Sequence, residues 1–236
     1  MTDRLDSFLA GSYVADEVYG LRPDYRVLLI AVSGLQPGVS DDDSEDLLRQ
    51  AEAATADALQ GGKPEDLPHI AAWREAYRAF GSKPQRTRNS VEALTRRAET
   101  GLPRVNRLTD IYNAVSVLHQ LPVGGEDLDK YQGSPHLIRA RGDEPFDTSA
   151  GGELVVEYPD PGEVVWCDDK GVTCRCWNWR QGRRTQLTDE TTSALFILDA
   201  LDPMTDEQLQ AAADDLIAHV RRLGPDVQVA TRLISP

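Results

Sequence analysis

The chain has 236 residues, with 39 acidic and 25 basic side chains and a formal net charge of −14. Apolar residues make up 40% and charged residues 27%, a composition typical of a folded globular protein and not of a disordered one. The longest apolar run is short, far below the ~20 residues of a membrane-spanning helix, and the acidic balance argues against DNA, so neither a membrane nor DNA is an expected partner.

The first half of the chain is expected to be mostly helical. Residues 1–24 show no clear pattern and are treated as an N-terminal extension, whereas the apolar run 26–32 predicts a strand. A helix is expected over residues 39–60, because an acidic cluster suits the positive end of a helix and apolar residues follow at helical spacing. Further amphipathic helices are expected over residues 70–80, 90–101 and from residue 109 onward.

The second half reads as strands. Short β-prone runs, divided by Gly, Pro or Asp, occupy residues 136–141, 153–158, 163–168, 172–179 and 194–201. An amphipathic helix over 206–223 and a strand over 227–234 close the chain. Helices followed by clustered strands predict an α+β fold, a mixed β-sheet core flanked by helices, in a single domain over residues 25–236.

Three cysteines lie close together, Cys167, Cys174 and Cys176. An odd number in a chain of this size argues against a disulfide framework and for a reducing compartment. Because charged residues precede any apolar stretch at the N-terminus, no signal peptide is expected and the predicted location is the cytoplasm. No histidine or fourth cysteine has the spacing of a zinc site, so buried free thiols are favoured over a metal or thiol enzyme, and no cofactor is expected.

Basic residues are concentrated in one part of the chain. Residues 71–107 hold nine basic and three acidic side chains, whereas both flanking regions are acidic. Such a block is either a footprint for an anionic ligand or surface charge that neighbouring acids balance in the fold.

A second candidate group surrounds two adjacent glycines. Asn106, Asp110 and Asn113 are spaced four and three residues apart, on the side of a predicted helix opposite its apolar stripe. A predicted turn with Gly124 and Gly125 follows, and adjacent glycines let a backbone approach a ligand closely. The polar residues are either a ligand site or an ordinary solvated helix face.

Two tryptophans form a third group. Trp177 and Trp179 are expected on the same side of a strand, where they are either core residues or a stacking platform for bases. Asn178 lies between them, and Arg180 follows directly.

Together these segments resemble the B3/B4 editing domain of the bacterial phenylalanyl-tRNA synthetase beta subunit. Residues 105–129, VNRLTDIYNAVSVLHQLPVGGEDLD, are similar to its helix-and-loop signature, and residues 161–201 are similar to its second half. Residues 73–97 resemble the leader of freestanding members. The resemblance covers roughly residues 25 to 232, and the two signatures in this order make it specific.

The resemblance implies a pocket for an aminoacylated tRNA end and, for a freestanding member, hydrolysis of a mischarged tRNA in trans by a positioned water. A complete aminoacyl-tRNA ligase is not expected. Three departures from the family pattern bear on specificity. Tyr112 replaces a Thr in the Thr-Asn pair, Gly124 and Gly125 replace a stretch with a pocket His, and Gln186 stands where a Glu reads the tyrosine hydroxyl.

The resemblance also assigns roles to residues. The expected catalytic positions are Gly124, Gly125 and Asn113, with the glycine amides as donors to the developing oxyanion. The expected substrate-binding positions are Asn106, Asp110, Glu126, Arg139, Trp177, Asn178, Arg180, Gln186, Thr188 and Thr191. The expected tRNA-binding positions are Arg74, Arg78, Arg86 and Arg88.

A different class of function uses the same pocket without chemistry. A non-catalytic module could bind a free amino acid, a small metabolite or RNA. The basic block discriminates between the two hypotheses. Arginines gathered beside Gly124 favour tRNA, whereas arginines paired with acids favour a small ligand.

Overall fold

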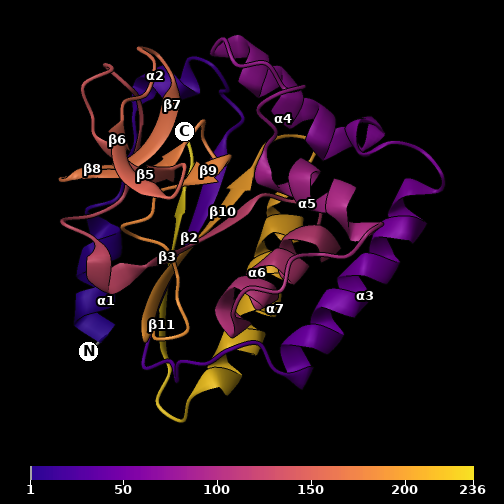
Figure 1. Ribbon diagram of the computed structural model, residues 1–236. Helices are drawn as coiled ribbons and strands as arrows, with labels where there is room; N and C mark the ends of the chain where they lie inside the picture. Colours follow the sequence, from indigo (N-terminus) through magenta and orange to yellow (C-terminus); the bar gives the residue numbers. More distant parts are fainter. Residues whose placement is uncertain (1) are drawn as a thin grey trace.

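The computed structural model describes residues 2–236 and consists of two β-sheets with helices packed around them (Figure 1). In chain order the helices and strands are α1 (Thr2–Ala10), β1 (Tyr13–Val14), α2 (Asp16–Tyr19), β2 (Arg26–Ser33), α3 (Asp42–Leu59), α4 (Pro68–Ala79), α5 (Ser90–Ala98), α6 (Arg107–Leu118), β3 (Val123–Asp127), β4 (His136–Arg139), β5 (Phe146–Ala150), β6 (Glu153–Glu157), β7 (Val164–Asp168), β8 (Gly171–Arg175), β9 (Arg180–Gln181), β10 (Ser193–Ala200), α7 (Asp206–Val220) and β11 (Gln228–Ile234).

The smaller sheet is antiparallel, with the strand order β11-β2-β10-β3. Its two central strands are buried on both faces. Leu28 and Phe196 belong to one apolar cluster, whereas Leu29 and Leu195 belong to another on the opposite side. This double burial explains why β2 and β10 read as continuous apolar runs and not as alternating ones.

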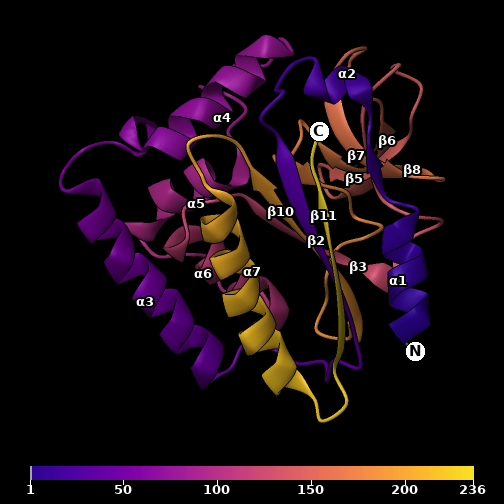
Figure 2. The same cartoon turned by 180° about the vertical axis from the view of Figure 1, so that it is seen from behind.

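Different layers cover the two faces of this sheet. Helices α3, α5, α6 and α7 pack on one face (Figure 2). The larger sheet, together with α1 and α4, covers the other. Within residues 2–236, no helix combines the length and the apolar character needed to cross a bilayer.

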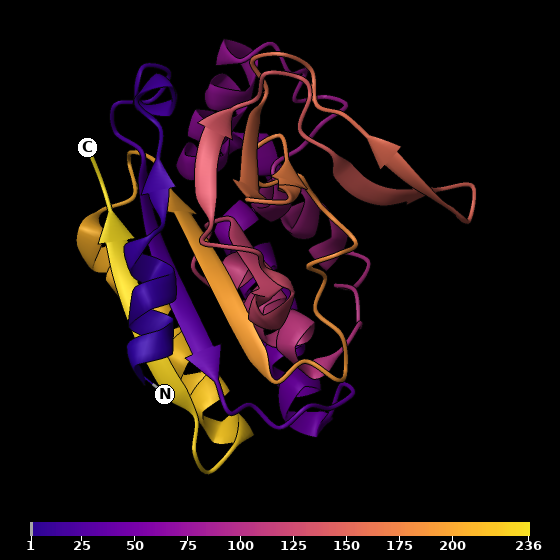
Figure 3. The ribbon, with the colours of Figure 1, turned by 90° about the vertical axis from the view of Figure 1, so that its left-hand side faces the viewer.

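The larger sheet has seven strands in the order β1-β4-β7-β8-β5-β6, and β9 pairs with β8. Strand β1 runs parallel to β4 and β5 runs parallel to β8, whereas the other pairs are antiparallel. The β5–β6 hairpin projects from the body of the molecule (Figure 3). The predicted α+β architecture with a mixed sheet is therefore confirmed.

The N-terminal segment that carried no sequence pattern is part of this architecture. Leu5 and Leu9 of α1 are buried in the same apolar cluster as β2. Strand β1 extends the larger sheet through the pairs Tyr13↔His136 and Val14↔Leu137. A strand of two residues is too short to produce an alternating pattern, so the sequence offered no signal for it.

Two local expectations are wrong. Gly124 and Gly125 lie inside strand β3 and not in a turn. Strand β8 ends at Arg175, and the backbone then reverses at Cys176 and Trp177, which have φ values of 46° and 65°. Trp177 therefore lies in a turn with a left-handed backbone, and its side chain is fully buried.

A buried carboxylate joins α4 to α5. Glu92, in the first turn of α5, is fully buried and accepts hydrogen bonds from Arg74 of α4 at 2.7 Å and from Arg96 at 3.1 Å. Arg88 adds an ion pair at 3.7 Å. These arginines of the basic block are thus paired with one acid.

We expect Glu92→Gln to lower the free energy of unfolding by about 3 kcal/mol, because removing one partner of a buried ion pair leaves the other charges uncompensated. Denaturant unfolding measures the loss. Glu99→Gln, at an exposed position at the end of the same helix, is the matched control and should change little. Equal stability of the two variants would contradict this role of Glu92.

Candidate functional site

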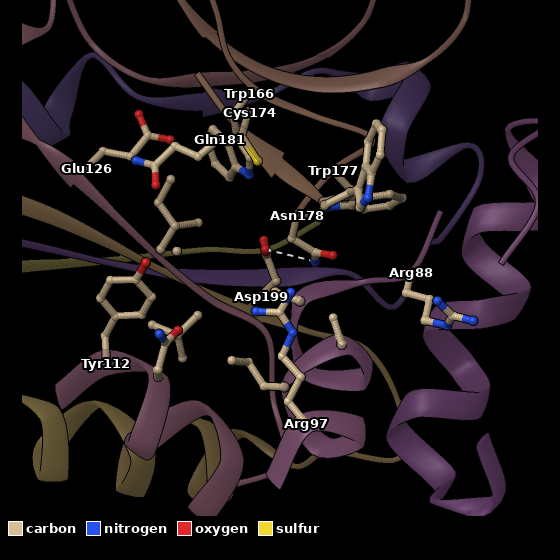
Figure 4. A pocket seen from close by; sticks show the side chains of 18 of the residues that line it. Arg88, Arg97, Tyr112, Glu126, Trp166, Cys174, Trp177, Asn178, Gln181 and Asp199 are labelled. Carbon is tan, nitrogen blue, oxygen red and sulfur yellow. Dashed lines mark hydrogen bonds between the residues drawn. The ribbon is translucent and has the colours of Figure 1, made fainter. Parts of the chain in front are cut away.

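A cavity of about 530 Å³ opens at the edge of the smaller sheet (Figure 4). Strands β3 and β10 line one side of it, and the larger sheet contributes Trp166 and Cys174. Helices α5 and α6 and the turn after β8 complete the wall. The cavity therefore lies where five separate segments of the chain meet, within residues 86–97, 112–126, 166, 174–181 and 197–199.

The register of β3 against β10 determines which side chains face the cavity. Glu126 pairs with Leu195, and Gly124 pairs with Ile197. Because paired residues of antiparallel strands share a face, Glu126, Gly124, Ile197 and Asp199 all lie on one side of the sheet. All four of these residues line the cavity.

The two glycines of β3 have different structural roles. A side chain at Gly125 would clash with Tyr112, with carbon atoms only 2.6 and 2.7 Å away, so this glycine lets α6 approach the sheet. A Cβ at Gly124 would meet only Ile197, at 3.9 Å, and would enter the cavity. The missing side chain at Gly124 therefore keeps the floor of the cavity open.

The amides of these glycines point in opposite directions. The Asp127 N–H donates to the Thr185 carbonyl at 2.8 Å, on the side of β3 away from β10. Backbone N–H groups alternate along an antiparallel strand, so the Gly125 N–H points to that outer edge and the Gly124 N–H points toward β10. The expected pair of amide donors is thus not aimed at one point.

Asp199 is a buried acid at the cavity wall, 1% exposed. Its carboxyl group accepts hydrogen bonds from the Tyr25 hydroxyl at 2.5 Å and from the Asn178 amide at 3.1 Å. Burial raises the pKa of Asp199 to about 7, although both hydrogen bonds oppose the shift. Asn178 is itself held by the Tyr77 hydroxyl at 2.9 Å, so the group is rigidly positioned.

Glu126 is a second buried acid, 2% exposed, across the cavity from Asp199 (Figure 4). Its carboxyl group accepts a hydrogen bond from the Tyr131 hydroxyl at 2.6 Å. Burial raises the pKa of Glu126 to about 7, against the effect of that hydrogen bond. Two carboxyl groups in one cavity thus titrate near neutral pH, as is common at functional sites.

These pKa values predict the pH dependence of stability. Between about pH 4 and pH 7 the folded protein keeps protons on Asp199 and Glu126 that the unfolded chain has lost. The contribution of each acid is therefore fully present below about pH 4 and is lost as the pH rises through 7. We expect Asp199→Asn and Glu126→Gln each to remove the loss of stability that its acid causes as the pH rises.

Urea unfolding of the two variants and the unsubstituted protein at pH 5 and pH 8 measures the effect. From pH 5 to pH 8 the unsubstituted protein should lose up to about 3 kcal/mol of unfolding free energy for each acid. Each variant should lack the loss that belongs to its own acid. Asp57→Asn, at an exposed position in α3, should follow the unsubstituted protein. Parallel pH profiles for all four proteins would contradict the raised pKa values.

Arginines of residues 86–97 line one side of the cavity, and because Arg86 and Arg97 are exposed this side is called the mouth of the cavity. Arg86, Arg88, Arg96 and Arg97 line it together with Gly124. Arg88 and Arg96 pair with Glu92, whereas Arg86 and Arg97 are exposed and have no ion pair within the described part of the chain. The basic block is thus divided into a structural part and a part that is available to an anionic ligand.

Several residues predicted for the site do meet in this cavity. Asn113 lines it, and its side chain makes no hydrogen bond to any described residue. Trp177, Asn178, Gly124 and Glu126 line it as well. Trp177 is fully buried and contacts Trp73 edge to face, so of the two predicted tryptophans it is Trp179, 38% exposed, that can stack on a base.

Other predicted residues have structural contacts. Asn106 caps α6 through the Thr109 N–H, and Asp110 is fully buried with hydrogen bonds from the Val105 N–H and the Ser40 hydroxyl. Neither belongs to a solvated helix face. The hydrogen bonds of both residues stabilise the N-terminal end of α6.

A further set lies outside the cavity. Arg139 donates to the Gly162 carbonyl, and Arg180 pairs with Glu157. Gln186 is exposed, opposite Glu126 in an isolated bridge. The remaining members of this set are Thr188 and Thr191, which form a turn anchored to Asp127, and Arg74 and Arg78 of α4.

The sequence reasoning missed Asp199, Trp166, Gln181, Cys174 and Arg97 as cavity residues. A signal existed for Asp199, because it is an acid inside an otherwise apolar strand. Gln181 occupies the cavity wall and donates to the Gly125 carbonyl at 2.6 Å. No comparable signal existed for Trp166, whose place depends on how the two sheets pack.

The cysteines are free thiols, and Cys174 reaches the cavity. Burial raises the pKa of Cys174 well above its ordinary value, which keeps the thiol protonated and unreactive as a nucleophile. Across residues 2–236, no cluster of three or more His, Cys, Asp or Glu side chains is arranged to hold a metal ion.

Comparison with known proteins gives three findings. A family model described as the B3/4 domain matches residues 72–228. No curated protein matches the chain. An N-terminal fragment of the phenylalanyl-tRNA synthetase beta-subunit from Pyrococcus horikoshii is similar in structure, with a TM-score of 0.47 and 14% identity, over 92% of this chain and 49% of that one. The chain thus spans about half the length of that fragment.

Proposed function

The chain belongs to the B3/4 domain family, and from this premise we propose that its cavity binds the aminoacyl end of a tRNA and hydrolyses the ester of a mischarged aminoacyl-tRNA in trans. One observation carries the proposal: a single cavity combines buried polar groups inside with unpaired arginines at its mouth. This arrangement matches a ligand that has a small polar end and a phosphate backbone.

The mouth provides the contacts for the tRNA end. Arg86 and Arg97 are exposed and free of ion pairs within residues 2–236, so their guanidinium groups can bind phosphates. Trp179, which also lines the cavity, offers an exposed ring for the terminal base. The net charge of −14 for the whole chain disfavours tRNA binding at the acidic parts of the surface.

The reaction is the attack of a water oxygen on the ester carbonyl carbon. The carbon–oxygen bond to the ribose breaks, and the products are a free amino acid and a tRNA with a free terminal hydroxyl group. The Asn113 amide, which makes no hydrogen bond to a described residue, is one side-chain donor that can reach the carbonyl oxygen, whereas the Gly124 N–H points toward β10. The cavity contributes mainly by holding ester and water in a reactive arrangement.

A deacylation assay with a panel of correctly and incorrectly charged tRNAs tests the proposal. We expect hydrolysis of at least one class, reduced about tenfold or more in Gly124→Val, whose side chain would fill the floor of the cavity. Gly20→Ala, at an exposed helical position with ordinary contacts, is the matched control. Absence of hydrolysis across the panel would refute a catalytic function.

The mouth arginines give a separate prediction. We expect Arg86→Ser and Arg97→Ser to weaken tRNA binding and to lower the slope of log K against log salt by about one for each arginine that is replaced. Arg221→Ser removes the same charge from an exposed position outside the cavity and should leave the slope unchanged. A filter-binding titration at several salt concentrations measures both quantities, and equal slopes would refute binding of phosphates by these arginines.

A non-catalytic binding module is the second candidate. The observation that favours it is the direction of the Gly124 N–H toward β10, which leaves the cavity without a pair of convergent amide donors. In that case the cavity holds a free amino acid or a small metabolite. Ligand binding without deacylation in the same panel would identify this function.

A further inference from the structure

Two buried acids in the cavity lining have no cationic partner among the described residues. Asp199 and Glu126 are 1% and 2% exposed, and their hydrogen bonds come from Tyr25, Asn178 and Tyr131. No lysine or arginine of the described chain forms an ion pair with either acid. Buried acids are normally paired, so a cation from outside the chain is the missing partner.

The two acids lie at opposite ends of one surface. Glu126 pairs with Leu195, four residues from Asp199 along β10, which places the backbone positions of Glu126 and Asp199 about 14 Å apart. Gly124 and Ile197 lie between them, without polar side chains. The floor therefore presents an acid, an apolar stretch and a second acid in line.

A buried donor in the same cavity also has no partner. The Trp166 side chain is 1% exposed, and its indole N–H makes no hydrogen bond to any described residue. Trp166 lines the cavity (Figure 4). An unsatisfied buried donor is costly, so the cavity is built for a ligand that also brings an acceptor atom.

We propose that the cavity selects an aminoacyl group with a basic side chain of the lysine or ornithine type. Asp199 binds the α-ammonium group, and Glu126 binds the side-chain ammonium group. The methylene stem crosses Gly124 and Ile197. The inference rests on the proposed function for the tRNA carrier, but the binding site itself can be tested without tRNA.

The position of the mouth orients the ligand. Arg97 extends from α5 toward Asp199, whereas Glu126 lies on the other side of the cavity beside Gln181 (Figure 4). The ester joins the α-carbon to the tRNA, so the α-ammonium group belongs at the end near the arginines. The basic side chain then points to Glu126.

Binding of such a ligand displaces protons. With an empty cavity, burial favours the neutral form of both acids, and an ammonium partner favours the ionised form. The titratable neighbours Tyr25, Tyr131 and Cys174 have pKa values raised well above their ordinary values, so they stay protonated. Each acid therefore releases a proton to solvent when its ammonium partner binds.

Calorimetric titration with lysinamide and norleucinamide at pH 6 tests the inference. The two probes share the α-ammonium group and the stem, but only lysinamide has the second cation. We expect lysinamide to bind about tenfold or more tightly, and to release more protons, measured in two buffers of different ionisation enthalpy. Equal affinity and equal proton release would overturn the proposal.

Variants separate the two acids. Glu126→Gln should abolish the preference for lysinamide and leave norleucinamide binding unchanged, whereas Asp199→Asn should weaken both probes. Asp57→Asn is the control with the same acid-to-amide replacement at an exposed position outside the cavity. Near-ultraviolet circular dichroism and unfolding curves verify that each variant is folded, and a preference retained in folded Glu126→Gln would overturn the assignment.

The tRNA assay distinguishes this inference from the proposed function. Faster hydrolysis of lysyl- or ornithyl-tRNA than of neutral aminoacyl-tRNAs would support both. Hydrolysis restricted to neutral aminoacyl groups would overturn the inference and leave the proposed function standing. Selective lysinamide binding without any hydrolysis would support the inference and refute catalysis.

Discussion

Strands β2 and β10 have no solvent-exposed face, and the rest of the molecule is arranged around this burial. Helices cover one side through residues such as Phe196, and the larger sheet covers the other through residues such as Leu195. A polar side chain in the middle of these strands is costly unless its polar atoms have hydrogen-bond partners. Asp199 meets this condition through Tyr25 and Asn178, which makes it a fixed polar group inside the core.

The cavity forms where this layered packing is incomplete, at the edge strand β3. Gly125 brings α6 close to the sheet, while Gly124 leaves space on the opposite face. Glu92 fixes α5 against α4, and this places the arginines of α5 at the mouth. The open floor thus depends on Gly124, the fixed position of Asp199 on Asn178, and the placement of the arginines on Glu92.

Only some residues of the candidate site could be predicted from the sequence. Asn113, Gly124 and Asn178 were found because they stand in compact signatures. Asn106 and Asp110 have the same residue types and helical spacing, but their polar atoms cap the start of α6. A spacing argument places residues on a face of a helix, and it does not tell whether that face meets solvent, backbone or a cavity.

The sequence by itself determined the fold class, the position of most helices and strands, and the family, because these depend on local periodicity and on ordered motifs. It did not determine which acids are paired. Glu92 is surrounded by arginines, whereas Asp199 and Glu126 line the cavity and form no ion pair with a described residue, and all three acids are buried. Only the tertiary structure decided this, because pairing of buried charges depends on contacts between elements far apart in the chain.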